Sequence, residues 1–200
     1  VSGEQHLSVQ STPSKDLRKR MDYTAVSTLN DKPLGNVKMT GYSDYLHPFG
    51  DGLLLGIGYE TDAKTSEKTG VKLTMFDISD PINLRILDSV TINEDFCSAA
   101  ENYKCAFVDT GRGLVGFATE TWTKTNYNRY MLFQWDGTSF VKKISLKKTQ
   151  QKMDTWTGAE QMRGLSSGDC FYVLHVERDD FSLISYDMKN DFQEIETKKY

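Results

Sequence analysis

Residues 41–90 read GYSDYLHPFGDGLLLGIGYETDAKTSEKTGVKLTMFDISDPINLRILDSV, and this stretch holds four strand-like runs separated by turn residues. The runs lie at 43–50, 53–59, 71–78 and 84–92. The glycines of GDG supply the positive backbone dihedrals of a tight hairpin, and DISDP favours a turn because Asp and Ser bond their own backbone. Four antiparallel strands with no helical periodicity between them are typical of one propeller blade.

The same order of runs and turns recurs along the chain. A second unit has runs at 105–109, 114–119, 129–135 and 140–146, and a third has them at 163–165, 170–177, 181–188 and 192–197. Upstream, the runs at 6–12, 21–29 and 34–40 resemble the later strands of an earlier unit. A β-sandwich is the alternative fold, but a sandwich does not explain turns that recur in a fixed order.

These patterns predict an all-β chain. We expect a β-propeller, or part of one, made of about four four-stranded antiparallel blades of which the first is incomplete. The expected blades are about 1–40, 41–95, 96–150 and 151–200. Residues 1–200 then form a single propeller domain or the C-terminal part of a larger one.

Three of the quoted segments resemble one known family. The segments are GYSDYLHP at 41–48, LGIG at 55–58 and MFDISDP at 75–81. They are similar to motifs of secreted bacterial and archaeal C-terminal β-propeller domain proteins, which are largely uncharacterised. The resemblance is specific over about fifty residues and looser over the next hundred. It implies an extracellular or cell-surface location, and it supplies no catalytic residues.

Composition excludes several classes of protein. The net charge of −4 gives no electrostatic footprint for nucleic acid, and no apolar run reaches the eighteen residues that a membrane span requires. The sequence contains no GxSxG motif, phosphate loop or dinucleotide fingerprint, so we expect no cofactor. The three histidines are scattered and no CxxC motif occurs, so we expect no metal site.

Cysteine spacing leaves one pairing open. Cys97 and Cys105 are eight residues apart, which a disulfide closes in an oxidising compartment, and Cys170 is then left over. The alternative is that these thiols are buried and reduced.

Binding residues on a propeller are expected at the strand ends and on the inner strands. Trp122, Tyr127 and Tyr130 surround one candidate loop, and exposed aromatic residues are good anchors for a peptide or sugar. Packing between blades is the competing interpretation of the same aromatic residues. The candidate binding residues are Tyr42, Asp44, Tyr45, His47, Glu101, Glu160, Arg163, Trp122 and Trp156.

The predicted function is a secreted or cell-surface interaction module without catalytic activity, whose partner is a protein, a peptide or a glycan. The alternative is a glycan-active or other hydrolytic enzyme in which Glu101 and Glu160 act as paired carboxylates. A propeller needs about four to eight blades to close into a ring, and three explanations of the blade number are possible. The chain is a fragment of a longer propeller, or two half-rings form a homodimer, or the chain closes alone as a small four-bladed ring.

Overall fold

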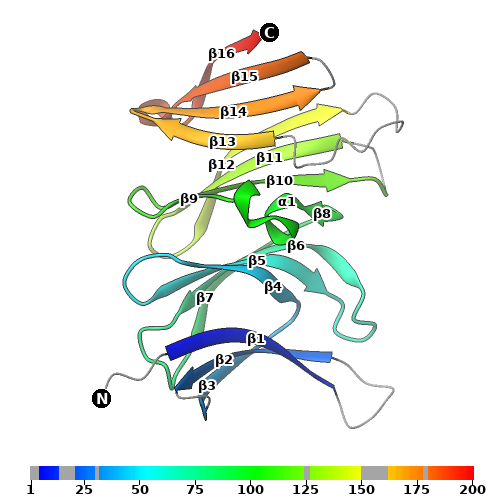
Figure 1. Ribbon diagram of the computed structural model, residues 1–200, viewed down its shortest axis with the longest axis vertical. Helices are drawn as coiled ribbons and strands as arrows, with labels where there is room; N and C mark the ends of the chain where they lie inside the picture. The colour runs from blue at the N-terminus through cyan, green and yellow to red at the C-terminus, as the bar shows by residue number, and fades with distance from the viewer. Residues whose placement is uncertain (1–4, 14–20, 30–31, 124–126, 150–161, 178–179) are drawn as a thin grey trace. The chain divides into compact units, whose positions relative to one another are not determined.

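The computed structural model describes residues 5–13, 21–29, 32–123, 127–149, 162–177 and 180–200. Strands make up nearly all of the regular structure (Figure 1). The chain divides into two compact units, residues 1–93 and residues 94–200. Each unit contains two antiparallel sheets, and each is described by itself below.

Unit 1 contains a three-stranded sheet and a four-stranded sheet. The strands of the first, in spatial order, are β1 (Gln5–Pro13), β2 (Met21–Leu29) and β3 (Lys32–Met39). The second sheet has the order β4 (Tyr42–Pro48), β5 (Leu53–Thr61), β6 (Lys68–Asp77) and β7 (Arg85–Ile92). These four bounds agree with the predicted runs to within a few residues, because Gly and Asp turns mark the ends of the strands.

Unit 2 contains two further sheets. The first has β10 (Leu114–Thr121), β11 (Tyr127–Trp135) and β12 (Phe140–Thr149), and the short strands β8 (Phe96–Cys97) and β9 (Phe107–Asp109) both pair with β10. The second has the order β13 (Met162–Ser167), β14 (Cys170–Glu177), β15 (Asp180–Asp187) and β16 (Gln193–Lys199), with the 3₁₀ turn η3 (Met188–Asn190) between β15 and β16.

One hydrogen bond occurs at the same place in all three of the larger sheets. The donor is the backbone N–H at the end of the third strand, or directly after it, and the acceptor is the carbonyl just before the second strand begins. The pairs are Ile78 N with Gly52 O at 2.7 Å, Trp135 N with Gly113 O at 2.7 Å, and Met188 N with Asp169 O at 2.9 Å. This shared bond allows the three sheets to be compared residue by residue. The residues that follow its acceptors, Leu53, Leu114 and Cys170, occupy equivalent positions at the start of the second strand.

Asp side chains start the turns that follow. Asp77 accepts the Ser79 N–H at 3.0 Å and Asp187 accepts the Lys189 N–H at 2.9 Å. Hydrogen bonds from the Ser79 hydroxyl and backbone, together with Arg85, lower the pKa of Asp77 to about 2. The Asx-type turn predicted for DISDP is therefore confirmed.

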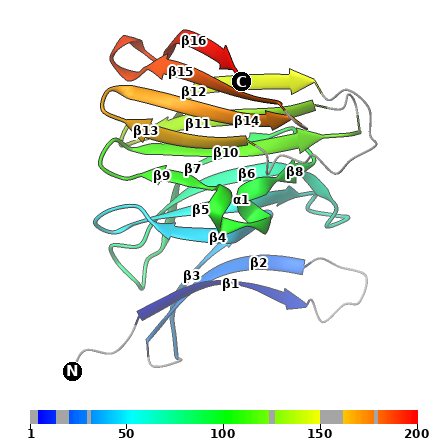
Figure 2. The same cartoon turned by 45° about the horizontal axis from the view of Figure 1, so that its top comes forward.

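The inner strand of the second predicted unit differs from the prediction. A strand was expected over 105–109, but β8 ends at Cys97 and β9 begins only at Phe107. Between them lie one helical turn, α1 (Ser98–Glu101), and a 3₁₀ turn, η1 (Tyr103–Cys105), on the same side of β10 (Figure 2).

The Ser98 side chain forms hydrogen bonds with the β10 backbone where β8 and β9 are interrupted. Its hydroxyl donates to the Ala118 carbonyl at 3.0 Å and accepts the Ala118 N–H at 3.2 Å. Ala118 lies between the residues of β10 that pair with β9 and those that pair with β8. A buried backbone segment must have hydrogen-bond partners, and Ser98 supplies them where the strand is absent.

Tyr130 lies in the core of unit 2 and not at a surface loop, as the packing interpretation of these aromatic residues predicts. It is fully buried, with its ring centroid 6.1 Å from that of Phe171 in the other sheet. A Cβ atom added to Gly116 or Gly164 would overlap the Tyr130 hydroxyl group. Tyr130 therefore fills a space that these two glycines leave between the sheets.

In the part of the chain that the structure describes, no helix is long and apolar enough to cross a membrane.

Candidate functional site

A β-bulge in β4 gathers three of the predicted residues onto one face. Strict alternation would put Tyr42 and Tyr45 on opposite faces. The register shifts between Ser43 and Tyr45, so that Tyr42 pairs with Tyr59, Tyr45 with Ile57 and His47 with Leu55. The three partners alternate along β5 and share one face, and Tyr42, Tyr45 and His47 therefore share it too.

Contacts within this row hold the rings in place. The Tyr45 hydroxyl and His47 Nδ1 are 2.8 Å apart, and burial raises the pKa of Tyr45. The rings of Tyr42 and Tyr59 lie 5.8 Å apart, with Lys68 Nζ 3.7 Å from the Tyr59 centroid. Asp44 occupies the bulge and is exposed. Tyr42, Tyr45 and His47 therefore form a partly buried row of rings, in which His47 is hydrogen-bonded to the Tyr45 hydroxyl.

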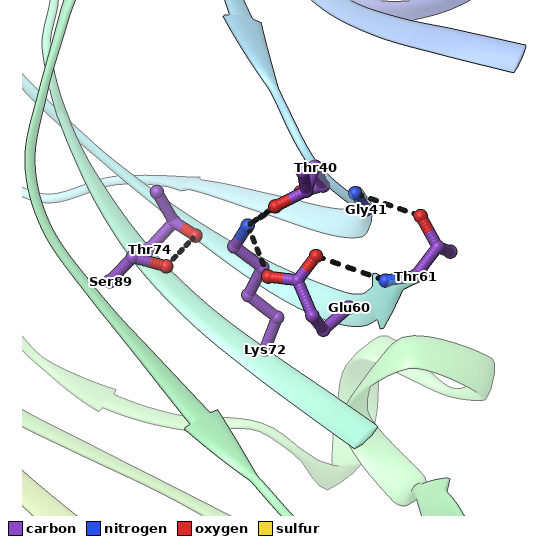
Figure 3. A network of polar contacts seen from close by, with 7 residues as sticks. All are labelled: Thr40, Gly41, Glu60, Thr61, Lys72, Thr74 and Ser89. Carbon is purple, nitrogen blue, oxygen red and sulfur yellow. Dashed lines mark hydrogen bonds and ion pairs between the residues drawn. The ribbon is translucent and has the colours of Figure 1, made fainter. Parts of the chain in front are cut away.

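A buried lysine, Lys72, lies on the opposite face of the same sheet, because it pairs with Gly58 while Tyr42 pairs with Tyr59. Figure 3 shows its polar contacts. Lys72 is 5% exposed, and its Nζ donates to the Thr40 carbonyl at 2.5 Å and lies 2.7 Å from Glu60 Oε2. The other carboxylate oxygen of Glu60 accepts the Thr61 N–H at 3.0 Å. Burial by itself raises the pKa of Glu60, but hydrogen bonds from Lys72, Thr40 and Thr61 lower it below its ordinary value.

This network joins the segment after β3 to strands β5 and β6. The Gly41 N–H donates to Thr61 Oγ1 at 3.1 Å, which adds a second contact between the same segments. Since the Lys72 ammonium and both Glu60 oxygens have partners, the pair satisfies the rule that buried charges are matched. We interpret it as a structural link and not as a binding site.

Unit 2 presents an exposed tryptophan on a firmly held loop. Trp122 follows β10 and is 52% exposed, and its ring centroid is 6.3 Å from that of Phe96. The Asp95 carboxylate accepts the backbone N–H groups of Trp122 at 2.9 Å and Thr123 at 3.0 Å, and the Thr121 hydroxyl at 2.9 Å. We call residues Asp95, Phe96, Trp122 and Thr123 the Trp122 platform.

Electrostatics keep Asp95 charged. Partial burial acts to raise its pKa, but the hydrogen bonds from Thr123, Trp122 and Thr121 outweigh that effect and lower it. A carboxylate with this many donors fixes the loop backbone at neutral pH. The backbone of Trp122 is therefore held in place before any ligand arrives.

A second carboxyl group, Glu94, lies next to Asp95 in the chain and has the opposite electrostatics. It is 5% exposed, and burial raises its pKa despite a hydrogen bond from Tyr127 and the charge of Arg129. Glu94 Oε1 accepts a hydrogen bond from the Tyr127 hydroxyl at 3.0 Å and lies 3.2 Å from Arg129 Nε. Its Oε2 has no hydrogen-bond partner among the residues that the structure describes. Neighbouring carboxyl groups with opposite pKa shifts show how strongly the local surroundings decide their charge.

The other predicted residues are not among the platform residues defined above, or lie outside the described residues. Glu101 is exposed at the end of α1, and Arg163 in β13 donates to the Met162 carbonyl at 3.1 Å. Glu160 and Trp156 are outside the described residues, so the carboxylate pair of Glu101 and Glu160 stays a prediction.

Cys97 and Cys105 are both buried at the two ends of the α1–η1 segment, and their disulfide also stays a prediction.

Sequence reasoning missed Asp95, Glu94 and Lys72. Asp95 had only a local signal, since an Asp just before a strand is typical of a capping carboxylate. Its partners Trp122 and Thr123 lie far along the chain, and the sequence alone does not bring them to it. Glu94 and Lys72 gave no such signal, because only the fold buries them. Among the residues that the structure describes, no group of three or more His, Cys, Asp or Glu side chains is arranged to hold a metal ion.

Comparison with known proteins identifies relatives whose similarity to this chain covers only a short part of their own length. An uncharacterized protein of Methanocaldococcus jannaschii is 39% identical over 74 residues, which is 37% of this chain and 11% of the relative. An uncharacterized protein of Archaeoglobus fulgidus is 26% identical over 115 residues, or 58% of this chain and 16% of the relative. The UPF0257 lipoprotein YnfC of Escherichia coli O157:H7 is 44% identical over 55 residues, or 27% of this chain and 23% of the relative.

The chain thus matches less than a quarter of the length of each of these relatives. The family model described as "Beta propeller domain" matches residues 29–183, which is most of the chain. Its match agrees with the antiparallel sheets of both units. The chain belongs to the beta propeller domain family.

Proposed function

We propose that this chain is a surface interaction module that presents the Trp122 platform to a protein, peptide or glycan partner and has no catalytic activity of its own. The observation that carries the proposal is the combination of an indole that is 52% exposed with a backbone fixed by the Asp95 carboxylate. Tryptophan residues are enriched among the residues that contribute most binding energy. A preformed loop loses little conformational entropy when it binds.

The proposed location is the cell surface. One relative bears the name lipoprotein, and the chain shares 44% identity with it over a short stretch. A rigid β scaffold with loops at its strand ends suits recognition outside the cell.

Binding to arrays of glycans and of peptides tests this proposal. We expect the labelled full chain to bind a defined subset of probes, and Trp122→Ala to weaken that binding by about 30-fold, the effect of losing a central aromatic anchor. Tyr103→Ala is the matched control, because Tyr103 is 68% exposed and lies outside the platform. Equal binding by the wild type and Trp122→Ala would contradict the assignment of the platform, and no binding to any probe would contradict the proposed ligand classes.

A further inference from the structure

The segment 98–106 interrupts the edge of β10 and then returns to it. Cys97 at the end of β8 pairs with Thr119, and Phe107 at the start of β9 pairs with Gly116. These partners are three positions apart on β10, so the gap in the edge is about 10 Å long. The helical turn α1 and the 3₁₀ turn η1 fill this gap with more residues than an extended strand would need. The segment therefore projects from the edge as a closed loop.

The register brings the second cysteine of this loop back toward the first. Ala106 is extended, with φ −76° and ψ 130°, so Cys105 prolongs the line of β9 two positions beyond Phe107. That line reaches the level of Ala118 on β10, one position from the level of Cys97. We therefore expect the Cα atoms of the two cysteines to lie roughly 4–7 Å apart. The Cα atoms of a disulfide are usually about 4.4–6.8 Å apart.

Burial distinguishes the two cysteines from the residues between them. Cys97 is 0% exposed and Cys105 is 1% exposed, whereas Glu101, Tyr103 and Lys104 are exposed. Helix α1 is a single turn whose N-terminus has no side-chain cap, and so short a helix is not stable by itself. Contacts at the buried base of the loop must therefore hold its shape.

We propose that Cys97 and Cys105 form a disulfide that closes the α1–η1 loop at its buried base. Both residues are thiols in the structure. Formation of the S–S bond removes one proton and one electron from each thiol, and a small disulfide such as oxidised glutathione accepts them and becomes two thiols. Oxidants of this kind prevail outside the cytoplasm, so the bond in the cell depends on the surface location proposed above. The third cysteine, Cys170, begins β14 in the other sheet of unit 2 and stays a thiol.

Tryptic mapping of the full 200-residue chain tests the pairing, because Lys104 lies between the two cysteines. The reduced chain is refolded in a mixture of reduced and oxidised glutathione, and the remaining thiols are blocked with an alkylating reagent. We expect peptides 86–104 and 105–112 to be recovered joined, lighter than their sum by two hydrogen atoms, and to separate on reduction. Peptide 164–178, which contains Cys170, should carry the alkyl group.

Thermal unfolding supplies a second measurement. Reduction of the bridged chain should lower its melting temperature by about 5–10 °C, because the bond restricts the unfolded chain. Cys105→Ser removes the bond, so its melting temperature should not change on reduction. Cys170→Ser is the matched control and should keep both the joined peptides and the shift.

Several outcomes would overturn the proposal. Recovery of peptide 105–112 alkylated, or bound to glutathione, from a folded chain would show that the two cysteines do not pair. A joined peptide that contains Cys170 would show a different pairing, and joined peptides found only in covalent dimers would show a bond between chains. Circular dichroism verifies folding, and the native chain is treated with the same glutathione mixture if refolding fails. None of these results affects the Trp122 platform, which the Trp122→Ala binding experiment tests separately.

Discussion

The Asp95 carboxylate holds the Trp122 backbone N–H at 2.9 Å, although the two residues are 27 positions apart in the chain. The same carboxylate accepts hydrogen bonds from Thr121 and Thr123, so one side chain holds residues 121–123. This contact holds the backbone of Trp122 in place within unit 2.

Asp95→Asn should loosen the loop and lower stability. The amide keeps the shape but replaces charge-assisted hydrogen bonds with weaker ones, which should cost about 1–2 kcal/mol in the free energy of unfolding. Urea titration followed by tryptophan fluorescence measures this loss. Asp51→Asn makes the same chemical change at an exposed turn and should have little effect; equal losses in the two variants would contradict the special role of Asp95.

Glu94 should make stability depend on pH. Burial raises its pKa in the folded protein above its value in the unfolded chain, so the folded state binds the proton more tightly. Its contribution to the free energy of unfolding should therefore be greatest below the unfolded pKa and fall as the pH rises through the folded pKa.

Urea titrations between pH 4 and pH 8 measure this effect as the difference between the wild type and Glu94→Gln. The difference should move in favour of Glu94→Gln as the pH rises. A difference that instead moves in favour of the wild type would mean that the Arg129 ion pair outweighs burial.

Lys72→Met should destabilise the protein through Glu60. The variant leaves a mostly buried carboxylate without its cation, and breaking a buried pair costs about 3–5 kcal/mol. Lys72→Met combined with Glu60→Gln should lose less than the single lysine variant, because no unpaired charge remains. A double-mutant cycle of unfolding free energies gives the coupling, and additive losses would show that the two residues act independently.

Gly41→Ala should cost more than the same change at Gly50. Both glycines have positive φ angles, +70° and +109°, so both substitutions strain the backbone. A Cβ at Gly41 would also overlap the Tyr59 carbonyl, whereas a Cβ at Gly50 meets nothing within 4 Å. We expect about 1–2 kcal/mol at Gly50 and a larger loss at Gly41, measured by thermal unfolding. Equal losses would show that the backbone near Gly41 moves aside.

The family match and the antiparallel sheets confirm the predicted all-β propeller fold. The prediction was possible because the signals for this fold are local in the sequence. Hairpin glycines and Asp-started turns act within a few residues, and they locate β4 to β7 closely. The interruption between β8 and β9 could not be predicted in the same way. It depends on Ser98 reaching Ala118, twenty residues away, to satisfy the backbone of β10.

Candidate site residues were harder to place, since their roles depend on distant partners. Tyr127 and Tyr130 looked alike in the sequence, yet Tyr130 fills a space beside Gly164 while Tyr127 binds Glu94. Tyr42, Tyr45 and His47 share one face of the sheet, although alternation alone would have divided them between two faces.

The sequence by itself determined which segments are strands and where they turn, because backbone preferences and side-chain capping act over short distances. The tertiary structure decided which polar groups are buried, as at Lys72 and Glu94, and which aromatic residue is offered to solvent, as at Trp122. It also decided that Tyr42 shares a face with Tyr45, through one bulged residue. Burial and charge depend on residues far apart in the chain, and only the folded sheets bring those residues together.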